Sequence, residues 1–161
     1  MKNNHEDKTN AMRLLTQAKI NYDVSYYEND GEIDGMSVAK KLHQDPDQVF
    51  KTLVTTNGKH EYFVFCIPVN ANLDLKKCAK VANQKSLEML PVKQLYPLTG
   101  YIRGGCSPVG MKKIFPTYIE ETAQLFDFIY VSAGKIGAQI NINPFDLLEF
   151  TQATFVSCCK E

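Results

Sequence analysis

The sequence predicts an α+β fold with a mixed or mainly antiparallel sheet. Expected strands outnumber expected helices, several strands are joined by hairpin turns, and the helices fall between them without strict βαβ alternation. With 161 residues, 44% of them hydrophobic, the chain is long enough for one compact domain with a core. We therefore expect a flexible N-terminal tail over residues 1–9 and a single domain over residues 10–161, with a partly closed sheet.

The first part of the chain is expected to form a helix, a strand and a second helix. Asn10 can cap an amphipathic helix whose apolar face consists of Ala11, Met12, Leu14, Leu15 and Ala18. Alternation over residues 22–27 predicts a half-buried strand, and residues 28–35 form a polar loop. Ser37 can then cap a short helix over residues 38–43.

A hairpin follows, because two strand-like runs, residues 49–56 and 60–69, flank the turn signal Asn57-Gly58. In the second half, Asn72 or Asp74 opens a helix. The later elements are a short strand over 87–90, a short helix from Pro91 to near Gly100, strands over 114–119, 126–132, 138–142 and 154–157, a turn or short helix over 120–125, and a helix from Pro144 through Phe150.

Composition narrows the function classes. Eighteen Lys and Arg balance eighteen Asp and Glu, so any nucleic-acid contact must come from a local basic patch, which argues against a dedicated duplex binder. The five cysteines are odd in number and lack metal-ligand spacing, which favours reduced thiols in the cytoplasm and no metal. No apolar run approaches the roughly 20 residues of a membrane span.

Lys51 is an anomaly within the first hairpin strand. Alternation places it with Leu53 and Thr55 on one face of a strand otherwise built of apolar residues and threonine. A buried lysine is costly unless it is paired or lies near a cleft. It therefore either holds an anionic or carbonyl-bearing ligand or reaches water from an edge strand.

The stretch from Gly104 to Lys113 concentrates glycines, Pro108 and a lysine pair. Its glycines permit positive φ or close approach of a ligand, and successive NH groups in such a turn suit a phosphate or an oxyanion. The alternative is a simple turn between two strands followed by a solvated lysine pair.

The sequence offers no evident nucleophile and base. Nothing places His5, His43 or His60 beside Cys106 or Ser107, so Cys106 is interpreted as a small loop residue rather than a catalytic thiol. Cys158 and Cys159 are neighbours near the C-terminus and are assigned to strand and tail packing. No nucleotide-binding, zinc or protease signature is present.

Four ordered blocks resemble the YbaK/EbsC family of aminoacyl-tRNA deacylases, and the likeness runs from about Asn10 to Phe155. The blocks are Phe50-Lys51-Thr52-Leu53 before the Asn-Gly turn, residues 72–77, Gly100-Tyr101 with residues 104–113, and residues 130–135. The resemblance implies a central, mixed, barrel-like sheet flanked by helices, related to the editing domain of prolyl-tRNA synthetase. It implies hydrolytic removal of a wrong amino acid from the tRNA 3′ end, without a cofactor.

The resemblance also assigns expected site residues. Lys51 would anchor and polarise the aminoacyl-adenosine end, with Thr52 beside it. The backbone of Gly104, Gly105, Cys106, Ser107 and Pro108 would bind the ester carbonyl and ribose, Tyr27 and Asp146 are lesser candidates for the pocket lining, and Gly134 with Lys135 for its rim. Asp34 stands where relatives carry an aromatic residue, so that wall of the pocket is not predicted.

The likeness is greatest to the branch that clears cysteine from tRNA(Pro), and Cys-tRNA(Cys) is a further candidate substrate. In that branch the substrate thiol would attack its own carbonyl and release a thiolactone. Removal of alanine by ribose-assisted water attack is the alternative within the family. Two other classes stay open: a non-catalytic module that grips an RNA end through Lys76, Lys77, Lys112 and Lys113, and a thiol enzyme that uses Cys106. Whether the protein acts free or docked to prolyl-tRNA synthetase is also open.

Overall fold

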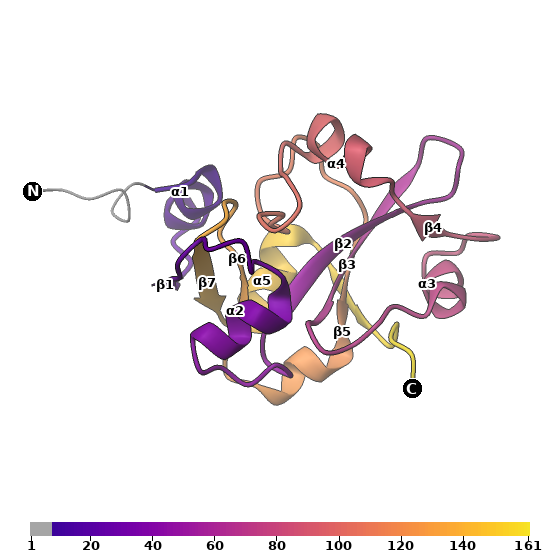
Figure 1. Cartoon of the computed structure of the whole chain (residues 1–161). Helices are drawn as coiled ribbons and strands as arrows, with labels where there is room; N and C mark the ends of the chain where they lie inside the picture. Colours follow the sequence, from indigo (N-terminus) through magenta and orange to yellow (C-terminus); the bar gives the residue numbers. More distant parts are fainter. Residues whose placement is uncertain (1–7) are drawn as a thin grey trace, which may run out of the picture.

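The computed structural model describes residues 8–161 (Figure 1). This part of the chain forms α1 (Asn10–Gln17), β1 (Asp23–Tyr26), α2 (Gly35–Lys41), β2 (Phe50–Thr56), β3 (Tyr62–Pro68), α3 (Leu75–Val81), β4 (Glu88–Met89), α4 (Val92–Thr99), β5 (Thr117–Glu120), the 3-10 helix η2 (Glu121–Leu125), β6 (Ile129–Ser132), β7 (Ala138–Ile142), α5 (Pro144–Thr151) and β8 (Thr154–Val156). The α+β class is confirmed. Residues 1–7 of the predicted tail lie outside the described residues.

The strands form two sheets that meet at one corner. β1, β7 and β6 make an antiparallel sheet in the order β1-β7-β6, and the other five make a mixed sheet in the order β4-β2-β3-β5-β8. In the mixed sheet β2 pairs antiparallel with β3 and β4, while β5 is parallel to β3 and β8. A parallel bridge between Val49 and Tyr130 joins the two sheets. Over the described residues, the expected barrel-like sheet is therefore partly closed.

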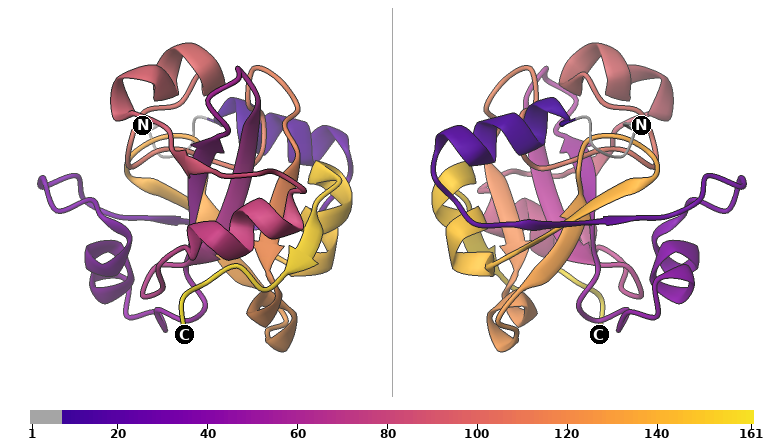
Figure 2. Two further views of the ribbon diagram at one scale, coloured as in Figure 1. Left: turned by 90° about the vertical axis from the view of Figure 1, so that its right-hand side faces the viewer. Right: turned by 90° about the vertical axis from the view of Figure 1, so that its left-hand side faces the viewer.

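The largest buried cluster lies between the two sheets and is covered by α1 and α5. It includes Met12, Leu15, Phe50, Cys66, Ile119, Ile129, Ile140 and Leu147. A second cluster lies on the outer face of the mixed sheet, where α3 packs against alternate residues of β3, namely Phe63, Phe65 and Ile67. Figure 2 (left) shows α3 crossing in front of this sheet. Because β3 is covered on both faces, its run of apolar residues is explained.

Two helices begin earlier than expected, because other side chains cap them. Thr9 caps α1, its hydroxyl accepting from the Met12 N–H at 3.2 Å and donating to the Ala133 carbonyl at 2.6 Å. Asp34 caps α2 by accepting from the Ser37 N–H at 3.2 Å. The expected caps Asn10 and Ser37 were therefore wrong.

The hairpin loop is longer than the Asn57-Gly58 signal suggested. Thr56 pairs with Tyr62, so five residues, 57–61, connect β2 to β3. The Asn57 side chain accepts from the Lys59 N–H at 2.8 Å, and both Gly58 and His60 have positive φ. A side-chain-stabilised loop replaces the two-residue turn, while the strand pairing itself is confirmed.

Candidate functional site

A cavity of about 850 Å³ lies along one edge of β2. β4 pairs with this edge at Thr55 and Thr56, and β6 approaches it at Val49. Residues 50–54 lie between these two points without a strand partner on that side in the described chain. The polar side chains of the lining belong to Tyr27, Asp34, Lys51, Thr52, Arg103, Ser132 and Gln139, and most of the remaining lining is apolar. A mostly apolar cavity with a few polar groups is the usual form of a small-ligand site.

The free edge of β2 presents backbone groups to the cavity. The Leu90 N–H donates to the Val54 carbonyl at 3.0 Å, and the Tyr130 N–H donates to the Gln48 carbonyl at 3.0 Å, both from this side. Because hydrogen-bonding direction alternates along a strand, the N–H and C=O of Thr52 face the same edge. The Thr52 hydroxyl instead contacts the Cys66 thiol at 3.9 Å. Thr52 therefore offers its backbone, rather than its hydroxyl, to a ligand.

Lys51 lines the cavity and is half-buried. Burial lowers the pKa of its ammonium, and the nearby Cys159 opposes this shift. Neither of the two ion pairs among the described residues involves Lys51. A partly desolvated cation without a carboxylate partner is suited to bind an anionic or carbonyl group that enters the cavity.

The predicted glycine loop divides into residues that line the cavity and residues that support it. Gly104 and Cys106 are in the lining, whereas Gly105, Ser107 and Pro108 are not. The buried Ser107 hydroxyl accepts from the Val109 N–H at 3.2 Å, which fixes the turn. Ser107 and Pro108 thus have a structural place in the loop.

The second glycine loop packs behind the first. A Cβ on Gly105 would lie 3.2 Å from backbone atoms of Lys135 and Ile136, and a Cβ on Gly134 would lie 3.0 Å from the Tyr101 ring. Gly134 and Lys135 are absent from the cavity lining among the described residues. Their contacts support the loop that carries Gly104 and Cys106, rather than forming the rim itself.

Cys106 has the properties of a neutral thiol. Burial, with a smaller effect from Cys66, raises the pKa of Cys106 to about 12. A thiol nucleophile needs a lowered pKa or an adjacent base, and no histidine occurs among the described residues that line the cavity. This agrees with the interpretation of Cys106 as a loop residue.

Of the two lesser candidates, Tyr27 and Asp146, one belongs to the described cavity lining and the other does not. Tyr27 lines the cavity, and its N–H donates to the Gly137 carbonyl at 3.0 Å. Asp146 lies exposed in the first turn of α5, away from the described cavity lining. Its part in the pocket therefore has no geometric support.

Sequence reasoning missed several lining residues. Arg103 directly precedes the glycine loop, which was a usable signal. Gln139 pairs with Gln44 through two side-chain hydrogen bonds of 2.8 and 3.0 Å, a contact across 95 positions that no local pattern predicts. Asp34, which the resemblance placed at a wall of the pocket, does line the cavity while it caps α2, and its hydrogen bonds from the Ser37 hydroxyl and N–H lower the pKa of its carboxyl.

Comparison with known proteins decides the family. The model of the aminoacyl-tRNA editing domain matches residues 35–150, which is most of the chain and includes Lys51 and the glycine loop. The chain belongs to this editing-domain family, of the YbaK/EbsC type. A protein of Enterococcus faecalis (strain ATCC 700802 / V583), named "Putative Cys-tRNA(Pro)/Cys-tRNA(Cys) deacylase EbsC", is 47% identical over 151 residues, which cover 93% of this chain and 92% of that protein.

Solved structures of other proteins share the fold. One, described as a "putative trans-editing enzyme for prolyl tRNA synthetase", has a TM-score of 0.78 and 22% identity, and the match covers 87% of each chain. The crystal structure of hypothetical protein APE2540 has a TM-score of 0.84 and 17% identity, covering 92% of this chain and 97% of the other. At these identities the likeness concerns the fold, which agrees with the editing-domain architecture expected above. Among the described residues, no helix is both long and apolar enough to span a bilayer.

Proposed function

We propose that this protein is an aminoacyl-tRNA deacylase that removes cysteine from tRNA(Pro), with Cys-tRNA(Cys) as a further substrate. The observation that carries the proposal is the position of Lys51, an unpaired and partly buried cation on the open edge of a cavity that Gly104 and Cys106 also line. Membership of the editing-domain family and the name of the Enterococcus relative support the substrate class.

Different groups of the cavity bind different parts of the aminoacylated 3′ end. The Lys51 ammonium and the Thr52 N–H donate to oxygens of the ester and the terminal ribose, and the Thr52 C=O accepts from the substrate amino group. Arg103, exposed beside the loop, lies where it can meet a phosphate. The apolar remainder of the lining excludes water from the ester and thereby strengthens these polar contacts.

The nucleophile comes from the substrate. Because Cys106 is a neutral thiol and the described lining holds no histidine, the cavity is suited to positioning rather than to covalent catalysis. The sulfur of the bound cysteine attacks its own ester carbon, and a C–S bond forms as the C–O bond to the ribose breaks. The thiol proton passes to the departing ribose oxygen, and a thiolactone leaves. Alignment of groups within one molecule can supply roughly 7–11 kcal/mol of such a barrier.

Release of labelled amino acid from Cys-tRNA(Pro), Ser-tRNA(Pro) and Ala-tRNA(Pro) under reducing conditions tests the proposal. We expect cysteine release by the wild type and a loss of at least about 100-fold in Lys51→Ala, because an electrostatic contact at the reacting ester is removed. Lys85→Ala is the matched control, since Lys85 is exposed and lies outside the cavity lining. Serine differs from cysteine in one atom, so slow serine release is expected if sulfur is the nucleophile.

Each other result leads to a defined conclusion. Release of alanine alone would replace the thiol mechanism by attack of water. Equal release of cysteine and serine would also exclude the thiol mechanism while keeping the deacylase. If no amino acid is released from any substrate while tRNA still binds, the proposed deacylase activity is wrong, and the protein is a module that binds RNA ends.

A further inference from the structure

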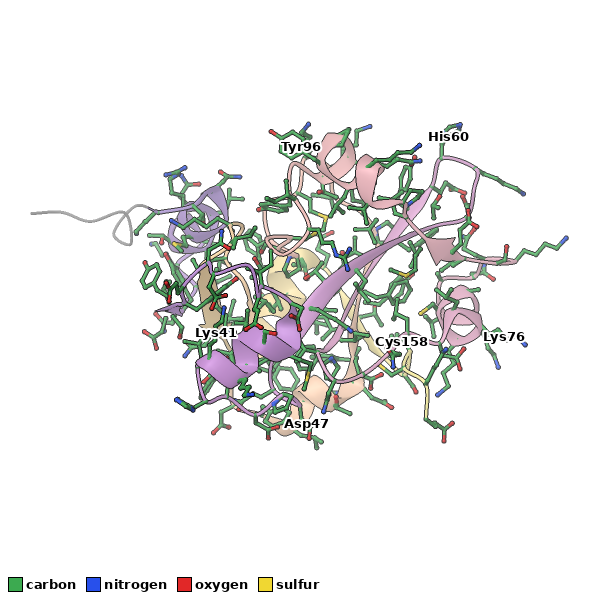
Figure 3. All side chains as sticks on the ribbon, in the orientation of Figure 1. Lys41, Asp47, His60, Lys76, Tyr96 and Cys158 are labelled. Atoms are coloured by element: carbon green, nitrogen blue, oxygen red, sulfur yellow. The ribbon has the colours of Figure 1, made fainter. Side chains whose placement is uncertain are left out.

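A cluster of potential metal ligands lies outside the described lining of the proposed substrate cavity, where the C-terminal segment crosses the end of β5. Glu120, Cys158 and Cys159 each place one ligand atom within 4.8 Å of the others. Glu120 is 6% exposed and Cys158 is fully buried, while Cys159 is half-buried. Cys158 lies between α3 and the mixed sheet (Figure 3). The Cys158 thiol donates to Glu120 Oε1 at 3.8 Å, so one sulfur of the pair already contacts the buried carboxylate.

We infer that Glu120, Cys158 and Cys159 form a binding site for a thiophilic divalent cation of the Zn²⁺ or Cd²⁺ class. Cysteine thiolates with one carboxylate are a ligand set that these ions accept, and three protein ligands leave a fourth position for water or another side chain. The spacing of the cysteines gave no such indication, because Glu120 is 38 positions away from Cys158 and joins it only in the fold.

The ligands are already held in place by other groups. Glu120 Oε1 accepts from the Cys158 N–H at 3.1 Å, and Oε2 accepts from the Thr122 N–H at 3.4 Å. The Cys158 carbonyl accepts from the Asp74 N–H at 2.9 Å, and Cys159 bridges to Leu73. Outer hydrogen bonds of this kind orient metal ligands and strengthen binding.

A nearby thiol offers a candidate for the fourth position. Cys78 Sγ on α3 donates to the Cys158 carbonyl at 3.7 Å and is therefore adjacent to the cluster. Cys78 lies on a helix that already packs against the C-terminal segment, so it is the candidate protein ligand for the fourth position. The alternative fourth ligand is water from the adjoining cavity.

Access and charge also fit a cation. A second cavity, of about 620 Å³, is lined by Glu120, Cys159 and Lys77, which gives an ion a path from solvent. With water in the fourth position, binding would release two thiol protons to solvent, so that two thiolates, one carboxylate and a divalent ion leave one negative charge. Lys77 Nζ lies 3.0 Å from the Cys159 carbonyl, and Lys51 interacts electrostatically with Cys159. Lys77, which also pairs with Glu161 at 3.5 Å, lies where it can compensate the remaining charge.

The test uses the full-length chain, reduced and stripped of metal with a chelator. Cd²⁺ is titrated while the thiolate-to-cadmium charge-transfer absorption is followed, and bound Zn²⁺ is counted by mass spectrometry after dialysis. We expect one ion per chain, and a rise in Tm with either ion because only the folded chain assembles the site. Cys159→Ser should lower the absorption and weaken affinity at least about tenfold, and Glu120→Gln should weaken the affinity as well.

Cys66→Ala is the matched control, because it removes a buried thiol outside the cluster and should leave binding unchanged. Glu120→Gln keeps an oxygen that can accept from the Cys158 N–H, so this variant tests the site even where a cysteine change impairs folding. Unchanged affinity in folded Cys159→Ser and Glu120→Gln, or the absence of a bound ion in the wild type, would overturn the site. Deacylase activity does not enter these readouts, so the two proposals can fail separately.

Discussion

At the scale of one residue, the function proposed for Lys51 would oppose its contribution to stability. Its ammonium is partly removed from water, and burial lowers its pKa from the ordinary lysine value. Neither described ion pair offers it a compensating carboxylate. The folded state therefore bears a desolvation cost, which a bound substrate oxygen would offset.

Replacement of Lys51 by methionine is expected to separate stability from activity. Lys51→Met should abolish cysteine release while leaving Tm unchanged or raised by up to about 4 °C, since an apolar side chain of similar length fills the site. In the window between its lowered pKa and the usual value of about 10.4, folded Lys51 binds fewer protons than the unfolded chain. Wild-type stability therefore rises with pH there, and the gap to the variant should narrow. Calorimetry from pH 7 to 11 measures the gap; a variant that is markedly less stable at pH 7 contradicts the desolvation cost.

Cys106 permits a second prediction at this scale. Because its pKa is raised to about 12, the thiol is protonated at neutral pH and is not a nucleophile. Cys106→Ala should keep kcat/KM for Cys-tRNA(Pro) within about fivefold of the wild type, while the lost sulfur costs roughly 1–2 kcal/mol of stability. Steady-state kinetics and urea denaturation provide the two measurements. A loss of activity beyond 100-fold in the folded variant would instead identify a thiol enzyme.

At the scale of elements, α2 and the loop before it form one wall of the cavity. Lys41 Nζ contacts the Asp30 carboxylate and donates to the Glu28 and Glu32 carbonyls at 3.1 and 2.7 Å, which closes the loop onto the helix. Figure 2 (right) shows this segment projecting to one side of β1. Polar contacts of Lys41 and a small buried cluster of Ala39, Val49 and Val69 therefore hold this wall together.

The cap of α2 should influence both stability and substrate binding. Asp34→Ala removes a helix cap and is expected to cost about 0.5–2 kcal/mol and to raise KM, because Asp34 also lines the cavity. The Ser37 hydroxyl, and then its N–H, lower the pKa of Asp34. Its contribution is therefore present above the usual carboxyl pKa and is lost as pH falls through the lowered value. Urea denaturation at neutral and acidic pH, with Asp127→Ala as an exposed control, should show a difference that disappears in acid. A difference that persists below the pKa of Asp34 would argue against the cap.

The elements also show what the sequence could and could not predict. The β2–β3 pairing and the helix opened by Asp74 follow from local alternation and capping, and both were predicted. The start of β5 at Thr117, rather than at residue 114, was not. Local pattern extends a strand through any apolar residue, whereas pairing with β3 begins only at Thr117.

At the scale of the whole molecule, the cavity depends on contacts between distant parts of the chain. The bridge of Val49 to Tyr130 and the packing of Gly105 against Lys135 and Ile136 bring β2, the glycine loop and β6 around one space. Sequence pattern identified Lys51 and the loop as unusual, but it could not show which loop residues face the cavity. The same limit explains why Arg103 and Gln139 were missed.

The zero net charge of the chain bears on how tRNA reaches the site. Eighteen basic and eighteen acidic residues leave no overall field to attract a polyanion, and Lys112, one of the paired lysines, is engaged with the Tyr96 ring at 5.5 Å. Few phosphates should therefore be neutralised on binding. The slope of log Kd against log salt should correspond to fewer than about three phosphates. Titration of unacylated tRNA(Pro) between low and physiological salt measures it, with Lys113→Ala as a probe of the remaining lysine. We expect weak affinity, and faster turnover when prolyl-tRNA synthetase is added, because a protein without its own electrostatic attraction gains from delivery of its substrate. A steep slope that falls by about one phosphate in Lys113→Ala would show instead that the glycine-loop lysines form a local basic surface sufficient to capture tRNA.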